Sequence, residues 1–278
     1  MKFLAAFSDQ GATDTFNKIL ETVCKLCKDR LTVRIDERSV HLINADFLRS
    51  NGTYLQITLH ATEFFSTYIM GGVSSECNEI VMELDKDHLL RSTTAARDQS
   101  IKIRLTKIGC IPHLKIEQKL NAVVHEIPIE LIPTKQWRSS LPPDKSGVKV
   151  SLFLPPLSTF RSLIVSLKNM GAKHLMIKAN RHGELQISGD MESAEVSIYF
   201  SDLSTSVSEQ SELVGDETNN TMFTVRVDIR AVYALFRSLL ANFTLSRTRL
   251  RIIPEKMAIF SIDQADATLF YAISGVVL

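Results

Sequence analysis

The chain has 278 residues, with 32 lysines and arginines against 31 aspartates and glutamates, so its formal net charge is +1. A hydrophobic content of 45% and a charged content of 23% are typical of a globular protein and exclude a mostly disordered, collagen-like or disulfide-framework chain. The length predicts two domains or one large barrel. A net charge near zero argues against a surface that is basic all round, but it allows charges that are sorted onto one face.

The first half begins with a predicted strand over 1–7, because its apolar stretch is too short for a signal peptide or a membrane helix. Apolar residues from Phe16 to Cys27 recur at helical spacing and predict a helix over 14–28. A weaker helix is expected over 85–97. Alternating apolar residues predict strands at 31–35, 40–42, 54–59, 79–84, 101–105 and 114–120.

The second half follows a predicted extended connector over 121–149, which holds four of the eight prolines and the sole tryptophan. One helix is expected over 158–170, ended by Gly171 as a left-handed cap, and another over 229–242. The serine-rich, acidic segment 201–220 predicts a loop. The expected strands are 175–179, 184–187, 196–200, 223–228, 250–253, 258–262 and 268–273.

The two halves repeat each other at an offset of about 144 residues, which is too long for a solenoid unit and indicates tandem domains. Thr15-Phe16 and Thr159-Phe160 occupy matching places in the first helix of each half. We therefore expect an α+β fold with two similar domains, 1–120 and 150–278, joined by the connector 121–149. Each domain is expected to have two helices on one face of its sheets.

The charges are sorted among these predicted elements. Helices 14–28 and 85–97 each carry a net +1, helices 158–170 and 229–242 each carry +2, and the loop 201–220 carries −5. Scattered cations on one surface suit phosphates that are contacted without base reading. The alternative is that these lysines and arginines only solvate the polar faces of their helices.

No residue pattern predicts catalysis, a metal or a cofactor. Cys24 and Cys27 have the spacing of redox and zinc sites, but both fall on the apolar stripe of the first helix, which favours core packing. The seven histidines lack metal-binding spacing, and no phosphate-binding glycine loop is present. Asp85 and Asp228 recur before the second helix of each half, where helix capping is expected. Four cysteines without a secretory signal predict free thiols in the cytosol or nucleus.

Five stretches of the sequence, spread over nearly the whole chain, resemble those of one family. They are the opening MKF, GVSSECNEIVMEL at 72–84, HEIPIELIPTKQW at 125–137, HLMIKANRHGELQI at 174–187 and VRVDIRAV at 225–232. The family is the Hus-one subunit of the nine-one-one DNA-damage checkpoint clamp. The resemblance implies the sliding-clamp fold of proliferating cell nuclear antigen, with two similar domains in each subunit.

The resemblance also implies a function without catalysis. Three subunits, this chain and two different sister subunits, would close head to tail into a heterotrimeric ring around duplex DNA, with helices lining the hole. The implied partners are the two sisters, DNA of any sequence, an ATP-driven clamp loader, and checkpoint and repair proteins, with no membrane. The implied location is the nucleus, and also the cytoplasm.

Three groups of site residues are expected from the charges, the strands and the family. The DNA-facing cations are Lys18, Lys25, Lys28, Arg91, Arg161, Lys168 and Arg237. Edge strands that pair with the sisters are expected to include Leu114, Ile116 and Leu120 in the first domain and Val196, Ile198 and Phe200 in the second. A groove for partner peptides is expected beside Ile127, Ile129, Leu131 and Ile132, although these residues could equally anchor the connector itself.

Three other functions remain open at this point. The chain could be a replicative clamp that forms a homotrimer and gives DNA polymerases processivity. It could be a thiol oxidoreductase that uses Cys24 and Cys27, which would require a lowered thiol pKa. It could also be a signalling scaffold that never encircles DNA.

Overall fold

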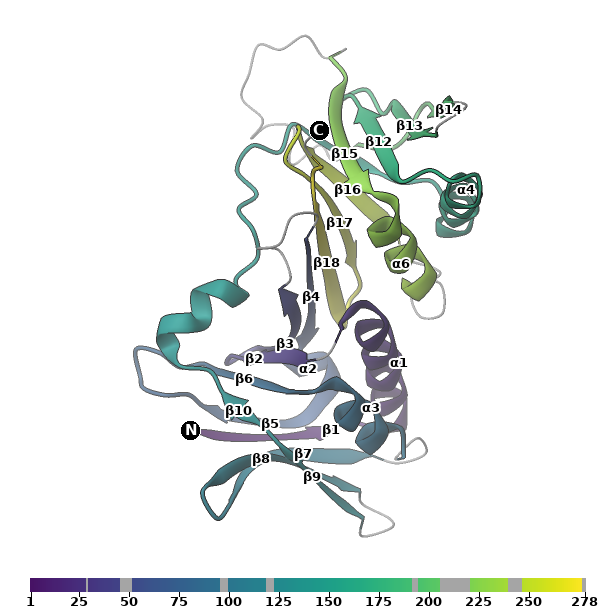
Figure 1. Cartoon of the computed structure of the whole chain (residues 1–278). Helices are drawn as coiled ribbons and strands as arrows, with labels where there is room; N and C mark the ends of the chain where they lie inside the picture. The colour runs from purple at the N-terminus through teal and green to yellow at the C-terminus, as the bar shows by residue number, and fades with distance from the viewer. Residues whose placement is uncertain are drawn as a thin grey trace. The chain divides into compact units, whose positions relative to one another are not determined.

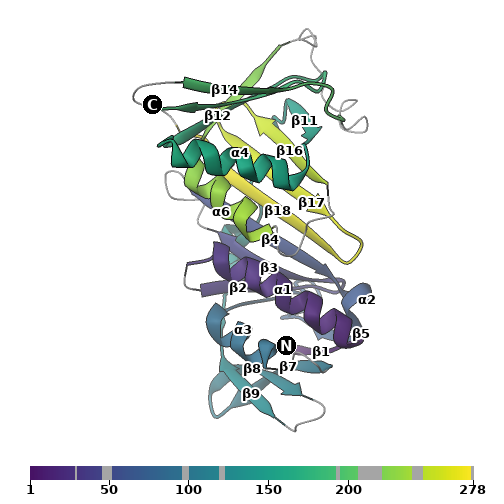
Figure 2. The same ribbon diagram turned by 90° about the vertical axis from the view of Figure 1, so that its right-hand side faces the viewer.

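The chain is described here from a computed structural model, shown in Figures 1 and 2. The structure describes residues 1–28, 30–45, 52–95, 100–118, 123–191, 195–205, 221–239 and 247–276. Two compact units make up the chain. Unit 1 comprises Met1–Asn44, Gln56–Leu141 and Gln264–Thr268, and unit 2 comprises Ala45–Leu55, Pro142–Asp263 and Leu269–Leu278.

Unit 1 is built from antiparallel strands and two main helices. Its elements are β1 (Lys2–Phe7), α1 (Gln10–Leu26), β2 (Arg30–Ile35), β3 (Ser39–Ala45), β4 (Thr53–His60), α2 (Ala61–Phe64), β5 (Phe65–Gly71), β6 (Ile80–Asp85), α3 (Lys86–Thr94), β7 (Ile101–Ile108), β8 (Ile111–Gln118), β9 (Val124–Pro128), β10 (Glu130–Leu131) and a 3-10 helix at Thr134–Ser140. One sheet has the strand order β5-β1-β7-β8-β9, and a second follows the order β10-β6-β2-β3-β4. Helices α1 and α3 lie side by side (Figure 2).

Unit 2 repeats this plan. Its elements are β11 (Val150–Phe153), α4 (Leu157–Asn169), β12 (His174–Ala179), β13 (Leu185–Asp190), β14 (Glu195–Phe200), β15 (Phe223–Asp228), α6 (Ile229–Leu239), β16 (Thr248–Ile253), β17 (Met257–Asp263) and β18 (Ala267–Ser274). The strand orders are β14-β13-β12-β15 and β18-β17-β16-β11. Helices α4 and α6 lie side by side, as Figure 1 shows.

The apolar stripes that the sequence predicted are the faces that the helices bury in the core. On α1, Phe16, Ile19, Leu20 and Val23 are buried, and the side chain of Asp9 caps the helix by accepting a hydrogen bond from the backbone N–H of Ala12 at 2.8 Å. This cap starts the helix at residue 10 rather than 14. The helix ends at Leu26, where residue 28 was predicted.

Aromatic side chains hold the helix pair of unit 2 to its sheet. The rings of Phe160 on α4 and Phe236 on α6 have centroids 4.6 Å apart, and Phe236 lies 5.6 Å from Phe260 on β17. All three side chains are almost fully buried. The expected end of α4 is confirmed, because Gly171 has a φ of 95°, a conformation that glycine adopts without strain.

Several strands were not predicted, and three of them, β5, β9 and β10, lie at the edges of the sheets. Strand β5 follows β4 after the short helix α2, but its polar residues Ser66 and Thr67 concealed it. The predicted connector 121–149 contains β9 and β10, so its first part belongs to the sheets of unit 1. The acidic loop predicted at 201–220 lies outside the described residues from position 206 onward.

Candidate nucleic-acid and subunit interfaces

The helices of unit 2 present cations away from their buried stripes. Arg161 and Lys168 are seven residues apart on α4, and Arg237 lies on α6. Arg161 and Arg237 are exposed and Lys168 is half-buried. The Lys168 ammonium nitrogen lies 3.9 Å from the centroid of the Tyr233 ring of α6. Neither helix contains an acidic residue, so their outer faces are basic.

A fourth cation of these helices is neutralised at its own helix start. Arg230 Nη2 lies 2.6 Å from Asp228 Oδ2, and the backbone N–H of Arg230 donates to Asp228 Oδ1 at 2.8 Å. Burial opposes ionisation of Asp228, yet these hydrogen bonds and the Arg230 charge hold the pKa of this carboxyl below its usual value. Asp85 accepts from the backbone N–H of His88 at 2.8 Å. The capping roles predicted for both aspartates are thereby confirmed.

The helices of unit 1 are less basic than the sequence suggested. Lys18 and Lys25 are exposed on α1, where Asp14 and Glu21 balance them. Lys28 was predicted on this helix, but the prediction is wrong because the helix ends at Leu26 and Lys28 lies in the bend beyond it.

The second helix of unit 1 carries one exposed cation. Arg91 lies on α3, and its Nε donates to the carbonyl oxygen of Asp87 at 3.2 Å. Lys86 of the same helix is largely covered, because its ammonium group donates to the Cys24 carbonyl oxygen at 3.1 Å. Arg97, which the sequence also placed on this helix, lies outside the described residues.

The strand predicted as the free edge of unit 1 is not an edge. Strand β8, which contains Leu114 and Ile116, pairs with β7 on one side and with β9 on the other. The two side chains are buried, and Leu120 lies outside the described residues. The prediction failed because 124–128 was read as connector, although its residues continue the sheet. The edge strand on this side is β9.

The register of β9 shows which backbone groups face outward. The N–H of Gln118 donates to the Val123 carbonyl oxygen at 3.0 Å, and the N–H of Ile129 donates to the Pro112 carbonyl oxygen at 3.1 Å. Because residues of an antiparallel pair alternate in the direction of their backbone groups, those of Val124 and Glu126 point away from β8. Pro128 has no N–H to offer, so the outward ladder of β9 is short.

Strand β14 is an edge of the four-stranded sheet among the described strands. It pairs with β13 from Glu195 to Phe200. Its residues Val196, Ile198 and Phe200 are half-buried, and Tyr199 is 70% exposed. The structure therefore places this strand where a partner strand can add to it, and its pairing with another subunit stays a prediction.

Two of the four residues named for the peptide groove are buried, and a groove beside these residues stays a prediction. Ile127 and Ile129 are buried, with 2% and 6% exposure, so they anchor β9 and the following turn to unit 1. Leu131 and Ile132 are half-buried. The N–H of Ile132 donates to the Val81 carbonyl oxygen at 2.9 Å, and its carbonyl oxygen accepts from the Trp137 indole at 2.8 Å. The burial of the two isoleucines favours the alternative interpretation, that these residues fasten the connector.

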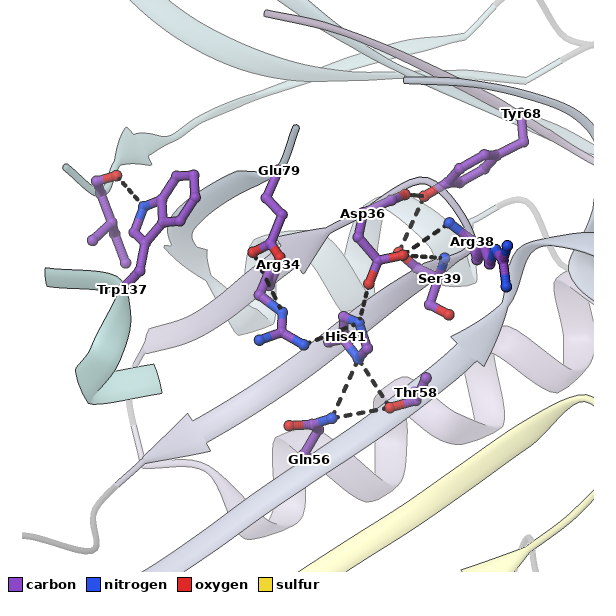
Figure 3. A network of polar contacts seen from close by, with 11 residues as sticks. Arg34, Asp36, Arg38, Ser39, His41, Gln56, Thr58, Tyr68, Glu79 and Trp137 are labelled. Atoms are coloured by element: carbon purple, nitrogen blue, oxygen red, sulfur yellow. Dashed lines mark hydrogen bonds and ion pairs between the residues drawn. The ribbon is translucent and has the colours of Figure 1, made fainter. Parts of the chain in front are cut away.

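A buried polar network lies on the β2–β3–β4 part of unit 1, and the sequence contained no signal for it. Figure 3 shows His41 between Asp36 and Thr58. Its Nε2 lies 2.7 Å from Asp36 Oδ2, and its Nδ1 lies 2.9 Å from Thr58 Oγ1. The Tyr68 hydroxyl donates to the carbonyl oxygen of Asp36 at 2.6 Å, which ties β5 to the β2–β3 turn. These bonds satisfy buried polar groups and order the strands.

Cys24 on α1 and Cys27 just after its end are poor nucleophiles. Burial raises the pKa of the Cys24 thiol to about 11 and that of Cys27 to about 12. This direction is opposite to the one that a thiol oxidoreductase needs. Within the described residues, no group of histidines, cysteines and carboxylates could hold a metal ion. No helix in that same part of the chain is long and apolar enough to cross a membrane.

The fold defines the class of protein. The structure resembles proliferating cell nuclear antigen of Entamoeba histolytica with a TM-score of 0.70 at 12% identity, over 99% of each chain. The antigen of Thermococcus kodakaraensis gives a TM-score of 0.68 at 15% identity, over 98% of this chain and 99% of that one. The chain therefore has the PCNA-like sliding-clamp fold, as the sequence predicted.

The sequence identifies the family within this class. Residues 1–277 match the Hus1-like protein family, and the chain belongs to it. It is 31% identical to the human checkpoint protein HUS1 over 98% of this chain and 99% of that protein. The Drosophila melanogaster checkpoint protein Hus1-like is 28% identical over 73% of this chain and 76% of its own length. The expected family is confirmed: the chain is a Hus1 checkpoint clamp subunit, a non-catalytic class of protein.

Proposed function

We propose that this chain is one of three different subunits of a ring that encircles duplex DNA at damage sites. The observation that carries the proposal is the full-length match to the Hus1-like family in a chain with the PCNA-like fold. In this role an ATP-driven clamp loader places the ring on DNA, and the ring recruits checkpoint and repair proteins. The chain acts in the nucleus, with a further pool in the cytoplasm.

The cations of the helices suit sequence-independent contact with DNA. Lysine and arginine side chains neutralise phosphates, which carry no base information, so a surface of this kind holds any sequence. A closed ring retains DNA by topology, and strong individual contacts would hinder sliding. Exposed Arg161, Arg237, Lys18 and Lys25, with half-buried Lys168, supply a sparse set of such contacts.

The free edges of β9 and β14 are proposed to join the chain to its two sisters. Each edge has backbone groups that an added strand can pair with, and the two edges belong to different units. One sister would meet β9 through the outward groups of Val124 and Glu126, and the other would meet Val196–Phe200. Such heterologous contacts close into a ring when the rotation suits three subunits. Unit 1, whose sheet includes β9, would supply one interface and unit 2 the other, while the domain bounds 1–120 and 150–278 with the connector 121–149 stay a prediction from the sequence.

The test is the mass of the particle that the chain forms. The purified chain of 31.2 kDa is analysed alone and after mixing with its two sister subunits, by sedimentation and native mass spectrometry. We expect no homotrimer alone and a 1:1:1 complex in the mixture. The likeness to proliferating cell nuclear antigen makes a homotrimeric polymerase clamp the second candidate. A particle of three times the chain mass in the absence of sisters would establish that candidate and reject the heterotrimer.

A further inference from the structure

Among the described parts of the four main helices, the largest excess of cations over acids lies on the helix pair of unit 2. Helices α4 and α6 contain four cations and no acid in their described ranges, and Arg230 forms an ion pair with Asp228. Helix α1 of unit 1 carries as many acids as lysines once its end at Leu26 is known. Phosphate contacts by this chain are therefore expected mainly from Arg161, Lys168 and Arg237. The expected phosphate contacts, and the role of Tyr233 that is inferred from them, rest on the proposed function.

An aromatic residue lies among these cations. Tyr233 follows Arg230 by three positions and precedes Arg237 by four, so the three side chains share one face of α6. Lys168 of α4 reaches over its ring, with the ammonium nitrogen 3.9 Å from the ring centroid. Buried contact between Phe160 and Phe236 holds the two helices at a fixed separation.

The contact between the Lys168 ammonium group and the Tyr233 ring restricts the lysine side chain, which is otherwise flexible. A lysine loses much rotamer entropy when its ammonium group is held at one point, and this cost lowers the affinity of an unrestrained lysine for phosphate. A cation over an aromatic face is attracted by the negative charge density of the ring. An ammonium group has three N–H donors, so those that point away from the ring can still reach a phosphate oxygen.

We propose that Tyr233 is a positioning residue for DNA binding, which holds the Lys168 ammonium group on the basic face of α4 and α6 before DNA arrives. The ring, rather than the hydroxyl, does this. Tyr233→Leu would keep Lys168 but would remove the ring that restrains its ammonium group. A phenylalanine would keep the ammonium group restrained.

The experiment uses the assembled three-subunit ring and a labelled short duplex, with affinity measured at several salt concentrations. Tyr233→Leu is expected to weaken binding roughly two- to fivefold, the effect of an exposed cation–π contact, without changing the salt dependence. Tyr233→Phe should bind as the parent does. Lys168→Gln should weaken binding and reduce the slope of log affinity against log salt by ~0.9, because one phosphate contact is lost. Tyr233→Leu should have no further effect when combined with Lys168→Gln.

A separate readout reports the restraint itself. The Lys168 ε-methylene protons should show an upfield ring-current shift in the parent and in Tyr233→Phe, and lose it in Tyr233→Leu. The positioning role of Tyr233 is rejected, and DNA contact by Lys168 stands, if Lys168→Gln weakens binding but Tyr233→Leu does not. The same conclusion follows if Tyr233→Leu weakens binding as much in the Lys168→Gln background as in the parent. If neither Lys168→Gln nor Arg237→Gln changes affinity or its salt dependence, the DNA contact proposed for this surface is itself rejected.

Discussion

At the scale of single residues, His41 is a buried ionisable group that is held by several polar contacts. It lies between Asp36 and Thr58 (Figure 3), with Arg34 Nη2 3.3 Å from its Nε2 and Gln56 Nε2 3.3 Å from its Nδ1. The charge of nearby Glu79 also acts on the ring. Burial, helped by the charge of Arg34, lowers the pKa of His41, although Asp36 acts to raise it. His41 is therefore neutral at neutral pH and is held by polar contacts that suit the neutral ring.

We expect this histidine to make the fold less stable in mild acid. An unfolded histidine titrates at about 6.5, above the lowered pKa of folded His41, so the unfolded chain binds more protons as the pH falls below about 6.5. The free energy of unfolding should decrease over that range and be flatter with pH in His41→Gln, as measured by urea denaturation. A further loss is expected below about pH 4, where the unfolded chain protonates Asp36 while the lowered pKa of the folded group keeps it ionised. Equal slopes for parent and variant near pH 6 would contradict the role of His41.

Asp85 gives a prediction that separates capping from charge. Its carboxylate accepts a hydrogen bond from the first turn of α3, and this bond is the first cause of the lowered pKa of the group. Asp85→Ala should lower the free energy of unfolding by about 1 kcal/mol, whereas Asp85→Asn should cost much less, because asparagine is also a good helix cap. Equal destabilisation by both changes would show that the negative charge, not the hydrogen bond, is what matters.

At the scale of elements, the identity of the edge strands decides how subunits can meet. Hydrophobic alternation predicted β8 correctly as a strand, but it could not show that β9 covers it, because a strand's neighbours depend on how the chain turns back. Residues 119–122, which join the two strands, lie outside the described part of the chain, and the proline-rich composition after them favoured a connector. The buried Ile127 and Ile129 were visible in the sequence as apolar residues, yet their burial depends on the sheet beneath them.

A substitution on β9 tests its outward edge. The N–H of Glu126 points away from β8 by the register of the pair, and its carboxylate lies 3.6 Å from Lys115 Nζ. Glu126→Pro should remove an outward donor and weaken assembly with one sister, while the isolated chain stays folded, because proline is tolerated on a free edge. Glu126→Ala removes the same ion pair and serves as the control.

The measurement for this test is the dissociation constant of the pairwise complex, with circular dichroism of the free chain beside it. Equal affinity of the proline and alanine variants for both sisters would exclude the outward edge of β9 from the subunit interface.

At the scale of the whole molecule, the proposed ring makes a topological prediction. Contacts through scattered cations are weakened by salt, whereas a closed ring around a circular duplex cannot leave without opening. A ring loaded on nicked circular DNA should therefore remain bound in high salt and be lost once the circle is cut, as followed by gel filtration of labelled complexes. Loss from the intact circle at the same rate as from the cut one would indicate a scaffold that binds without encircling.

The sequence by itself determined the type and order of most elements, because apolar periodicity and capping residues act within one helix or strand. The four main helices were all found this way, with ends that differed by a few residues. The family, and the clamp fold that it implies, followed from the resemblance of five stretches of the sequence. The opening net charge of +1 was also resolved from the sequence into basic helices and an acidic loop.

Only the tertiary structure decided which groups are available for function. It showed that β9 covers β8, that Ile127 and Ile129 are buried, and that Lys168 lies on the ring of Tyr233. It also showed that Lys28 lies beyond its helix and that Arg230 is neutralised by Asp228. Strand neighbours and cross-helix contacts join segments far apart in the chain, and even local ion pairs depend on the backbone that orients them. Availability of a side chain is therefore a property of the packed molecule rather than of its sequence pattern.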